Sequence, residues 1–456
     1  MINAQQENAR MLASLIGVHE DEAAERLDRT VLITSALDEK SQNWAHEIRA
    51  LIERTVNVSI DPAVKATVEL VVGDAEGRGS VPRIYASIDR QKAVIDTAPV
   101  TVSNSSSHGL FAAIAACPVA AAALSKAIAA KGVPTATLPL VIRLSDLGIT
   151  EAALEASINV DDAVLIGAGA VGHGFLRALR HVHASGRLPI VDPKKVGGGN
   201  LNRCLYLEAA DVGIDKAVAL ARNAQVDLPS VTLEPFIGDF HEYVKSNGVQ
   251  QTAIVTVDSR RVRRSIQSEV PGRVFDASTT DIRSVVVHSH ELPTDNACLS
   301  CIYKHVAVEN VRERAIAESL GVDIAMVKEN LISAAAAAQI AMRYPDQPTS
   351  AFVGMAYDSL FKQLCAEQAL STPEGRQVLA PFAFVSSLAG ALIVVEMLRF
   401  KAGLATTNYW QVDPWARPID RIRILRKRVA DCEFCSRLHV RDFVDQSWGQ
   451  ISPKPF

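Results

Sequence analysis

The sequence has little net charge, no secretion signal and no long uninterrupted hydrophobic run. Its 456 residues carry a formal net charge of −4, which gives no electrostatic footprint for nucleic acid or an anionic membrane. Residues 1–10 lack the basic and apolar blocks of a signal peptide. The longest apolar stretch, residues 381–398, contains Ser386, Ser387 and Glu396, so we expect a buried helix rather than a membrane span. These absences predict a cytoplasmic protein with no membrane or nucleic-acid partner.

The seven cysteines cannot all be paired, which argues against a complete disulfide framework. Four of them form two CxxC pairs, and two such pairs can surround a tetrahedral Zn²⁺. A redox-active CxxC would open a helix after a strand, whereas here one pair follows a loop and the other follows a basic strand. The context favours structural zinc over redox chemistry, and His439 could replace one ligand. The predicted ligands are Cys298, Cys301, Cys432 and Cys435.

A buried strand followed by a glycine-rich loop begins at Ala163. The strand AVLIG leads into Gly167-Ala168-Gly169-Ala170-Val171-Gly172, and a helical pattern follows. Such a loop lets the backbone turn tightly and approach a phosphate at the N-terminus of the helix. A second apolar run ends in Asp192, whose carboxylate is placed to accept hydrogen bonds from a ribose. The segment predicts a nucleotide-binding βαβ unit.

Basic residues follow this unit in a way that a dinucleotide dehydrogenase does not need. The segments Asn200-Leu201-Asn202-Arg203 and Gly213-Ile214-Asp215-Lys216 lie in one short connection. An enzyme that attacks the α-phosphate of ATP does need cations there, because they offset the charge that builds as pyrophosphate leaves. Further on, the buried-strand pattern of residues 252–257 ends in Asp258.

This constellation resembles the adenylating domain of the ubiquitin-activating enzyme superfamily, including the ThiF-type adenylyltransferases of thiamine and molybdopterin sulfur transfer. The resemblance implies that ATP lies against the glycine loop and that Asp192 holds the ribose. It also implies that Asn200, Asn202, Arg203 and Lys216 contact the nucleotide and its phosphates. Asp258 would coordinate Mg²⁺, although its carboxylate could instead, or in addition, cap the following helix. Many members of the superfamily also carry Zn²⁺ between two distant CxxC pairs.

Three cysteines remain outside the CxxC pairs. Cys117 lies in an Ala-rich helical stretch and is expected to be buried, and Cys204 is interpreted as a packing residue near the nucleotide. Cys365 lies between the first CxxC pair and the apolar helix, where relatives place the cysteine that accepts the acyl group. Two interpretations of Cys365 stay open, a catalytic nucleophile and a small core residue.

The length predicts two or three domains. Alternating strand and helix patterns from residue 158 onward predict a doubly wound Rossmann-like adenylation domain over 158–456, with an antiparallel sheet extension at 282–290 and 421–426. A helical crossover region interrupts it at about 306–371. Residues 1–150 predict a smaller α/β domain, either a scaffold for dimerisation or a dock for a protein substrate. Arg10, Arg26 and Arg29 are candidates for an arginine that reaches into a partner's ATP site.

The leading functional hypothesis is an ATP-dependent activating enzyme whose partner is a ubiquitin-like or sulfur-carrier protein ending in glycine. The resemblance also implies a homodimer and allows a downstream conjugating protein as a second partner. The enzyme would adenylate the partner's C-terminal carboxylate and pass the acyl group to Cys365. Two alternatives remain. One is an adenylating enzyme acting on a peptide, a small carboxylate or a tRNA base without a thioester; the other is a non-catalytic subunit of a heterodimeric activating enzyme.

Overall fold

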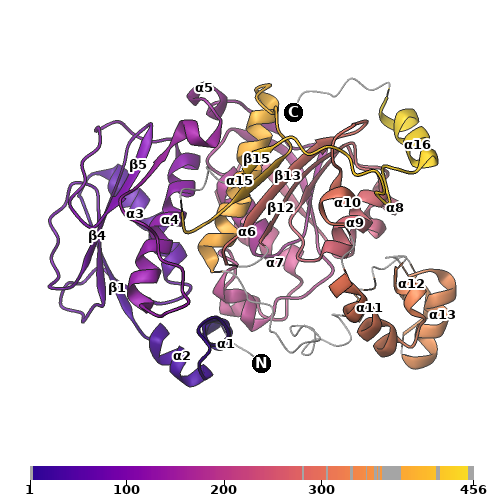
Figure 1. The fold of residues 1–456 in the computed structure, drawn as a ribbon, viewed down its shortest axis with the longest axis horizontal. Helices are drawn as coiled ribbons and strands as arrows, with labels where there is room; N and C mark the ends of the chain where they lie inside the picture. Colours follow the sequence, from indigo (N-terminus) through magenta and orange to yellow (C-terminus); the bar gives the residue numbers. More distant parts are fainter. Residues whose placement is uncertain are drawn as a thin grey trace.

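Two β-sheets, joined by buried helices, form the molecule (Figure 1). The computed structural model describes residues 4–279, 282–304, 307–328, 332–345, 347–353, 357, 360–361, 382–416 and 422–449. The first sheet has the strand order β2-β1-β3-β4-β5-β6, and the second has the order β10-β9-β8-β11-β12-β13-β14-β15, with β7 beside β9.

The N-terminal part of the chain forms the first sheet and its helices. Strands β1 to β4 pair in parallel along the sheet order, whereas β4, β5 and β6 pair antiparallel. The chain begins with two helices that are separated where Gly17 takes a positive φ of 74°, and His19 caps the second one. Strands β4 and β5 form a hairpin. The elements are α1 (Ala4–Ile16), α2 (Glu20–Leu27), β1 (Thr30–Ser35), α3 (Glu39–Ile52), β2 (Asn57–Ser59), β3 (Val68–Val72), β4 (Arg83–Ile88), β5 (Lys92–Asp96), α4 (Gly109–Ile128) and β6 (Leu140–Arg143).

The second sheet confirms the predicted doubly wound fold with its antiparallel extension. Strands β10, β9, β8, β11 and β12 are parallel, and β13, β14 and β15 continue the sheet antiparallel. The helix predicted after the glycine loop ends at Leu179, and the chain enters β9 at Ala184. The elements are β7 (Ile158–Asn159), β8 (Ala163–Ile166), α6 (Ala170–Leu179), β9 (Ala184–Val191), α7 (Lys216–Ala224), β10 (Val231–Phe236), α8 (Phe240–Asn247), β11 (Thr252–Val255), α9 (Arg260–Ser268), β12 (Arg273–Thr279), β13 (Val285–Glu291), β14 (Tyr409–Val412) and β15 (Ile422–Ile424).

The apolar run forms a buried helix, α15 (Ala383–Lys401), as predicted. It packs against α6 and α4 and against strands β12 and β13, so it connects the two sheets (Figure 1). Gly390 allows α15 to approach α6, since a Cβ there would lie 2.1 Å from the backbone nitrogen of Phe175. Helices α4 and α15 are long and apolar enough to cross a membrane, but 78% and 94% of their apolar windows are buried inside the protein. Their surroundings are those of core helices.

Three of the remaining helices form a group of their own (Figure 1). α11 (Ala307–Leu320), α12 (Ile324–Lys328) and α13 (Ala334–Arg343) belong to the predicted helical crossover and form a separate small core around Ile316, Leu320 and Ile340. Shorter helices are α5 (Glu151–Leu154) and α10 (Leu299–Ile302), and α16 (Leu438–Trp448) packs beside the cysteine pairs.

Candidate nucleotide and metal sites

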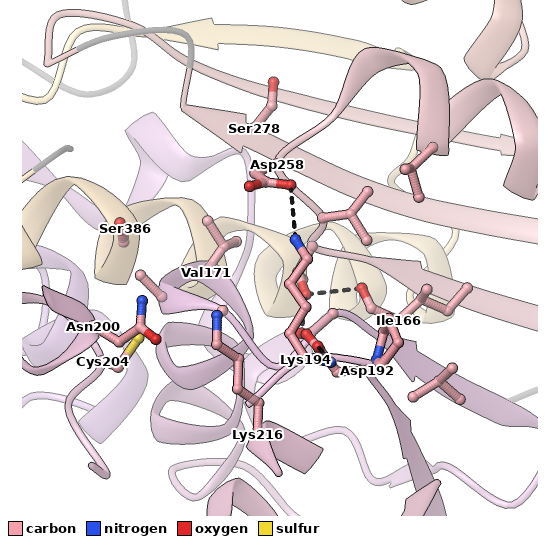
Figure 2. A pocket seen from close by; sticks show the side chains of 18 of the residues that line it. Ile166, Val171, Asp192, Lys194, Asn200, Cys204, Lys216, Asp258, Ser278 and Ser386 are labelled. Carbon is pink, nitrogen blue, oxygen red and sulfur yellow. Dashed lines mark hydrogen bonds and ion pairs between the residues drawn. The ribbon is translucent and has the colours of Figure 1, made fainter. Parts of the chain in front are cut away.

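A cavity of about 250 Å³ opens at the carboxyl ends of β8, β9 and β11 (Figure 2). Ligands of doubly wound sheets bind at this edge. Most of the predicted nucleotide residues line the cavity, although they come from five separate segments. They are Gly167, Gly169, Asp192, Asn200, Arg203, Lys216 and Asp258.

The glycine loop has the shape that a phosphate requires. Gly167 takes a positive φ of 104°, and a Cβ at Gly172 would lie 2.4 Å from the carbonyl oxygen of Gly167. Gly169 is different, because no atom lies within 4 Å of the place where its Cβ would be. This open side faces the N-terminus of α6, where backbone N–H groups attract an anion.

Asp192 holds the loop in place at the end of β9. Its two carboxylate oxygens accept hydrogen bonds from the backbone nitrogens of Ala168 and Lys194, each at 2.8 Å. Ala168 therefore contributes its backbone to Asp192 and does not itself line the cavity. The carboxylate can still accept hydrogen bonds from a ribose through its remaining lone pairs.

The connection after β9 forms a 3-10 turn over Gly198–Asn202. The side-chain oxygen of Asn200 caps this turn by accepting a hydrogen bond from the backbone nitrogen of Gly197 at 2.9 Å. Asn202 points away from the cavity: its amide nitrogen donates to Asn8 of α1 at 2.9 Å, and its oxygen accepts from Arg203 at 2.6 Å. Asn202 thus orients Arg203 and links it to the N-terminal domain.

Three further charged side chains line the cavity, those of Lys194, Lys216 and Asp258. The backbone nitrogen of Lys216, the first residue of α7, donates to the carbonyl of Lys194 at 2.8 Å, so the two lysines start side by side. The Lys194 ammonium lies 3.7 Å from the Asp258 carboxylate (Figure 2). Ser259, and not Asp258, caps α9 by accepting from the backbone nitrogen of Val262. The interpretation of Asp258 as the helix cap is therefore wrong, and its carboxylate lies at the cavity.

Two of the three cysteines outside the CxxC pairs lie in the described part of the chain, and both are buried. Cys117 is buried in α4 as expected, and Cys204 is buried against the cavity. Burial raises the pKa of both thiols, so neither is suited to be a thiolate nucleophile. Cys365 lies outside the described residues.

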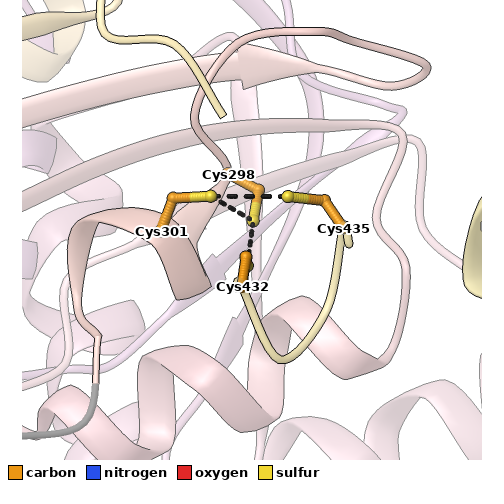
Figure 3. A group of neighbouring side chains, drawn as sticks. All are labelled: Cys298, Cys301, Cys432 and Cys435. Atoms are coloured by element: carbon orange, nitrogen blue, oxygen red, sulfur yellow. Dashed lines mark hydrogen bonds between the residues drawn. The ribbon is translucent and has the colours of Figure 1, made fainter. Parts of the chain in front are cut away.

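The four CxxC cysteines come together between α10 and the segment before α16 (Figure 3). Their sulfur atoms all lie within 4.8 Å of one another, with separations of 3.7 Å from Cys298 to Cys301 and to Cys432 and 3.4 Å from Cys301 to Cys435. A tetrahedron with Zn–S bonds of about 2.3 Å has sulfur atoms about 3.8 Å apart. The buried cluster therefore fits a four-coordinate metal, and His439 does not belong to it.

Comparison with known proteins places this arrangement in a family. Residues 1–150 match the E1 N-terminal domain, and residues 146–434, more than half of the chain, match the ThiF family. The chain belongs to the ThiF family.

A curated protein is similar to this chain at low sequence identity. Uncharacterized protein y4jF of Sinorhizobium fredii (strain NBRC 101917 / NGR234) is 27% identical over 264 residues, covering 55% of this chain and 51% of that protein. This chain thus spans about half the length of the curated relative it matches.

Solved structures of Escherichia coli MccB are also similar to this ThiF-family chain, at low scores. The structure with ATP has a TM-score of 0.38 and 12% identity, covering 73% of this chain and 75% of that chain. The structure of MccB alone has a TM-score of 0.39 and 13% identity, covering 64% and 68%. The microcin C7 biosynthetic enzyme MccB in complex with N-formylated MccA has a TM-score of 0.38 and 12% identity, covering 64% and 70%.

Several residues of the ThiF-family cavity were not predicted from the sequence. Glu7 of α1 lines it, with its carboxylate 3.9 Å from Arg203. Thr256 donates its hydroxyl to the carbonyls of Ile166 and Gly167 at 3.0 and 2.6 Å and so fixes the start of the glycine loop. Lys194 follows the ribose-type aspartate, and its position two residues after Asp192 could have revealed it. Glu7 had no such signal, since it lies in another domain.

Arg263 also lines the cavity, and its guanidinium belongs to a buried hydrogen-bond network. Its guanidinium donates to Asp276 at 2.7 Å, and the Tyr303 hydroxyl donates to the other oxygen of the same carboxylate. Burial raises the pKa of Tyr303, so the phenol keeps its proton and remains a donor. The three candidates for an arginine in trans, Arg10, Arg26 and Arg29, do not line this chain's cavity.

Proposed function

We propose that this chain is an ATP-dependent adenylyltransferase that activates the C-terminal carboxylate of a ubiquitin-like or sulfur-carrier protein. The supporting observation is a single cavity with a glycine loop, a helix N-terminus, a ribose-type carboxylate and cations from separate segments. ThiF-family membership supports the same chemistry. We assign the N-terminal domain to 1–150 and the adenylation domain to 158–456.

In the proposed reaction, a carboxylate oxygen of the partner attacks the α-phosphorus of ATP. The bond from that phosphorus to the bridging oxygen of the β-phosphate breaks, pyrophosphate leaves with its electron pair, and an acyl-adenylate forms. Arg203 and Lys216 stabilise the charge that accumulates on the phosphates. The glycine loop and Asp192 hold the nucleotide in place.

The donor set at the cavity mouth fits a hard cation. Asp258 offers carboxylate oxygens, its side chain is 69% exposed, and it faces the same space as Lys194 and Lys216. Mg²⁺ held by Asp258 together with the phosphates would supply charge neutralisation. In the cysteine cluster we assign the metal as structural Zn²⁺.

We further propose that Cys365 then attacks the acyl carbon, releasing AMP and forming a thioester. If so, Cys365→Ala keeps pyrophosphate exchange but loses a thiol-sensitive adduct with the partner. An adduct that survives in Cys365→Ala would refute this assignment. Robust exchange without any adduct in the wild type would favour the second candidate function, adenylation that stops at the acyl-adenylate. Retention of the cavity's charged residues argues against the third, a non-catalytic subunit.

Pyrophosphate exchange into ATP tests the proposal. Small proteins ending in glycine are added as carboxylate partners, with their C-terminal amides as blanks. We expect exchange only with partners that carry the free C-terminal carboxylate. We expect at least a hundredfold loss in Asp258→Asn, because the variant lacks the carboxylate that would hold Mg²⁺ at the phosphates. Asp21→Asn, an exposed aspartate of α2, is the matched control. Exchange at the wild-type rate in Asp258→Asn would refute the assignment of Asp258.

A further inference from the structure

Lys194 is a cation at the cavity to which the proposed mechanism gives no role. Its side chain lines the cavity, is 28% exposed, and reaches Asp258 at 3.7 Å (Figure 2). An ion pair of this length with a largely exposed carboxylate is weak. Its ammonium can therefore exchange this partner at little cost.

The backbone of Lys194 lies between two parts of the nucleotide site. Its nitrogen donates to Asp192, the proposed ribose ligand, and its carbonyl accepts from Lys216, a proposed phosphate ligand. The side chain therefore starts between the ribose and phosphate positions and extends along the cavity. The adjacent Lys195 differs, because it pairs with Asp215 at 3.0 Å, is 65% exposed and does not line the cavity.

We propose that Lys194 is a phosphate-binding residue, whose ammonium leaves Asp258 for the phosphates of ATP when the nucleotide enters. The inference rests on the proposed function, since it assumes ATP in this cavity. A triphosphate carries several negative charges and attracts the ammonium more strongly than one carboxylate does. A lysine suits such an exchange, because its charge is compact and its four-carbon stem is flexible. Lys194 would thus keep Asp258 neutralised in the empty site and add a third cation to Arg203 and Lys216 in the occupied one.

A simpler role would be to balance the charge of Asp258 without touching ATP. The two roles differ when the carboxylate is removed. If Lys194 only balances Asp258, its loss has no effect on ATP affinity in an Asp258→Asn background. If Lys194 binds phosphate, its loss weakens ATP binding in both backgrounds.

Isothermal titration calorimetry with ATP tests this, in EDTA and again with excess Mg²⁺. In EDTA we expect Lys194→Gln and the equally long Lys194→Met to raise the Kd for ATP by about tenfold to a hundredfold, the effect of losing one charge-assisted contact. The Kd of Lys194→Arg stays within a few-fold of the wild-type Kd, because the positive charge is kept. The Kd of Lys195→Gln equals the wild-type Kd. Asp258→Asn binds at least as tightly as the wild type, and Lys194→Gln in that background is again weaker by about tenfold or more. Thermal unfolding midpoints check that each variant is folded.

The inference is overturned if Lys194→Gln and Lys194→Met bind ATP as the wild type does, or if Lys194→Gln has no effect in the Asp258→Asn background. In both cases the proposed function survives, because the wild type still binds ATP. If the wild type binds no ATP, the proposed function and this inference fail together.

Discussion

At the scale of single residues, Thr256 shows how one hydroxyl can shape the nucleotide loop. It is 4% exposed, and it bonds the carbonyls of Ile166 and Gly167 at the turn out of β8. Thr256→Val keeps the volume but leaves the Gly167 carbonyl without this donor. We expect a loss of about 1–3 kcal/mol of unfolding free energy and weaker ATP binding, since the glycine loop is released.

Thr252 provides a matched control at the start of β11, the strand that ends just before Thr256. Its hydroxyl is buried and has no hydrogen-bond partner among the residues that the structure describes. Thr252→Val should therefore be neutral or stabilising. Urea unfolding of both variants checks the pair, and equal losses of stability in the two would contradict the role given to Thr256.

His173 makes the stability depend on pH. It lies fully buried in α6, and burial, followed by the nearby charges of Lys216 and Arg54, lowers its pKa to about 3. The unfolded chain takes up a proton at a pKa of about 6.5 whereas the folded chain does not, so stability is complete above that pH and is lost as the pH falls toward 3. We expect His173 to contribute a loss of about 2 kcal/mol between about pH 6.5 and pH 5.

His173→Asn tests this, because its side-chain oxygen can accept the hydrogen bond that Nδ1 accepts from the backbone nitrogen of Tyr206. Urea unfolding at several pH values should give a shallower pH dependence for the variant. An unchanged slope would show that His173 is protonated in the folded protein.

At the scale of elements, the N-terminal domain stabilises the loop that carries Arg203 through hydrogen bonds and packing. The Arg54 guanidinium donates to the carbonyls of Leu201, Leu205 and Leu207 at 2.9, 2.9 and 3.2 Å, and α1 packs on the same turn. Arg54→Ala leaves these carbonyls without their donor. We expect a several-fold weaker ATP affinity and faster amide hydrogen exchange over 200–207, since the loop opens more often. Arg49→Ala on α3, whose arginine is 45% exposed, is the control, and equal exchange in both variants would contradict the role of Arg54.

The sequence predicted most elements because their apolar periodicity and turn residues agree with the tertiary fold. The β8–α6–β9 unit was recognised from its glycines and its buried strands. The end of α6 and the start of β9 were not predicted, because the four residues between them contain no residue that clearly ends a helix. Strand β6 was missed altogether, because Leu140–Arg143 is short and its partner β5 is distant in the sequence.

At the scale of the whole molecule, the cysteine cluster joins two segments that are far apart in the sequence. Cys298 caps α10 and Cys301 lies within it, whereas Cys432 and Cys435 precede α16. We expect one zinc per chain by elemental analysis, falling to nearly none in Cys298→Ser, with a lower unfolding midpoint because metal binding is coupled to folding. Cys117→Ala should keep its zinc, since that cysteine is buried in α4. Freshly purified protein without metal would contradict the prediction.

The site could be predicted only in part, because some of its residues follow one another in the sequence and others meet only through tertiary packing. The glycine loop, Asp192, Arg203, Lys216 and Asp258 follow one another in a recognisable order, and the parallel sheet brings them to one edge. Glu7 belongs to α1, and no local pattern places that helix against the turn of Arg203. Thr256 acts on the path of the backbone at the glycine loop, which no local pattern reveals. The approach of Lys194 to Asp258 depends on the packing of several elements.

The central claim is that a carboxylate attacks the α-phosphorus of ATP in this cavity. The most direct test uses a partner whose C-terminal carboxylate is labelled with ¹⁸O, with hydroxylamine to cleave the acyl-adenylate at its carbonyl carbon. We expect AMP carrying one ¹⁸O atom and unlabelled pyrophosphate. Release of ADP with the label in inorganic phosphate would contradict it.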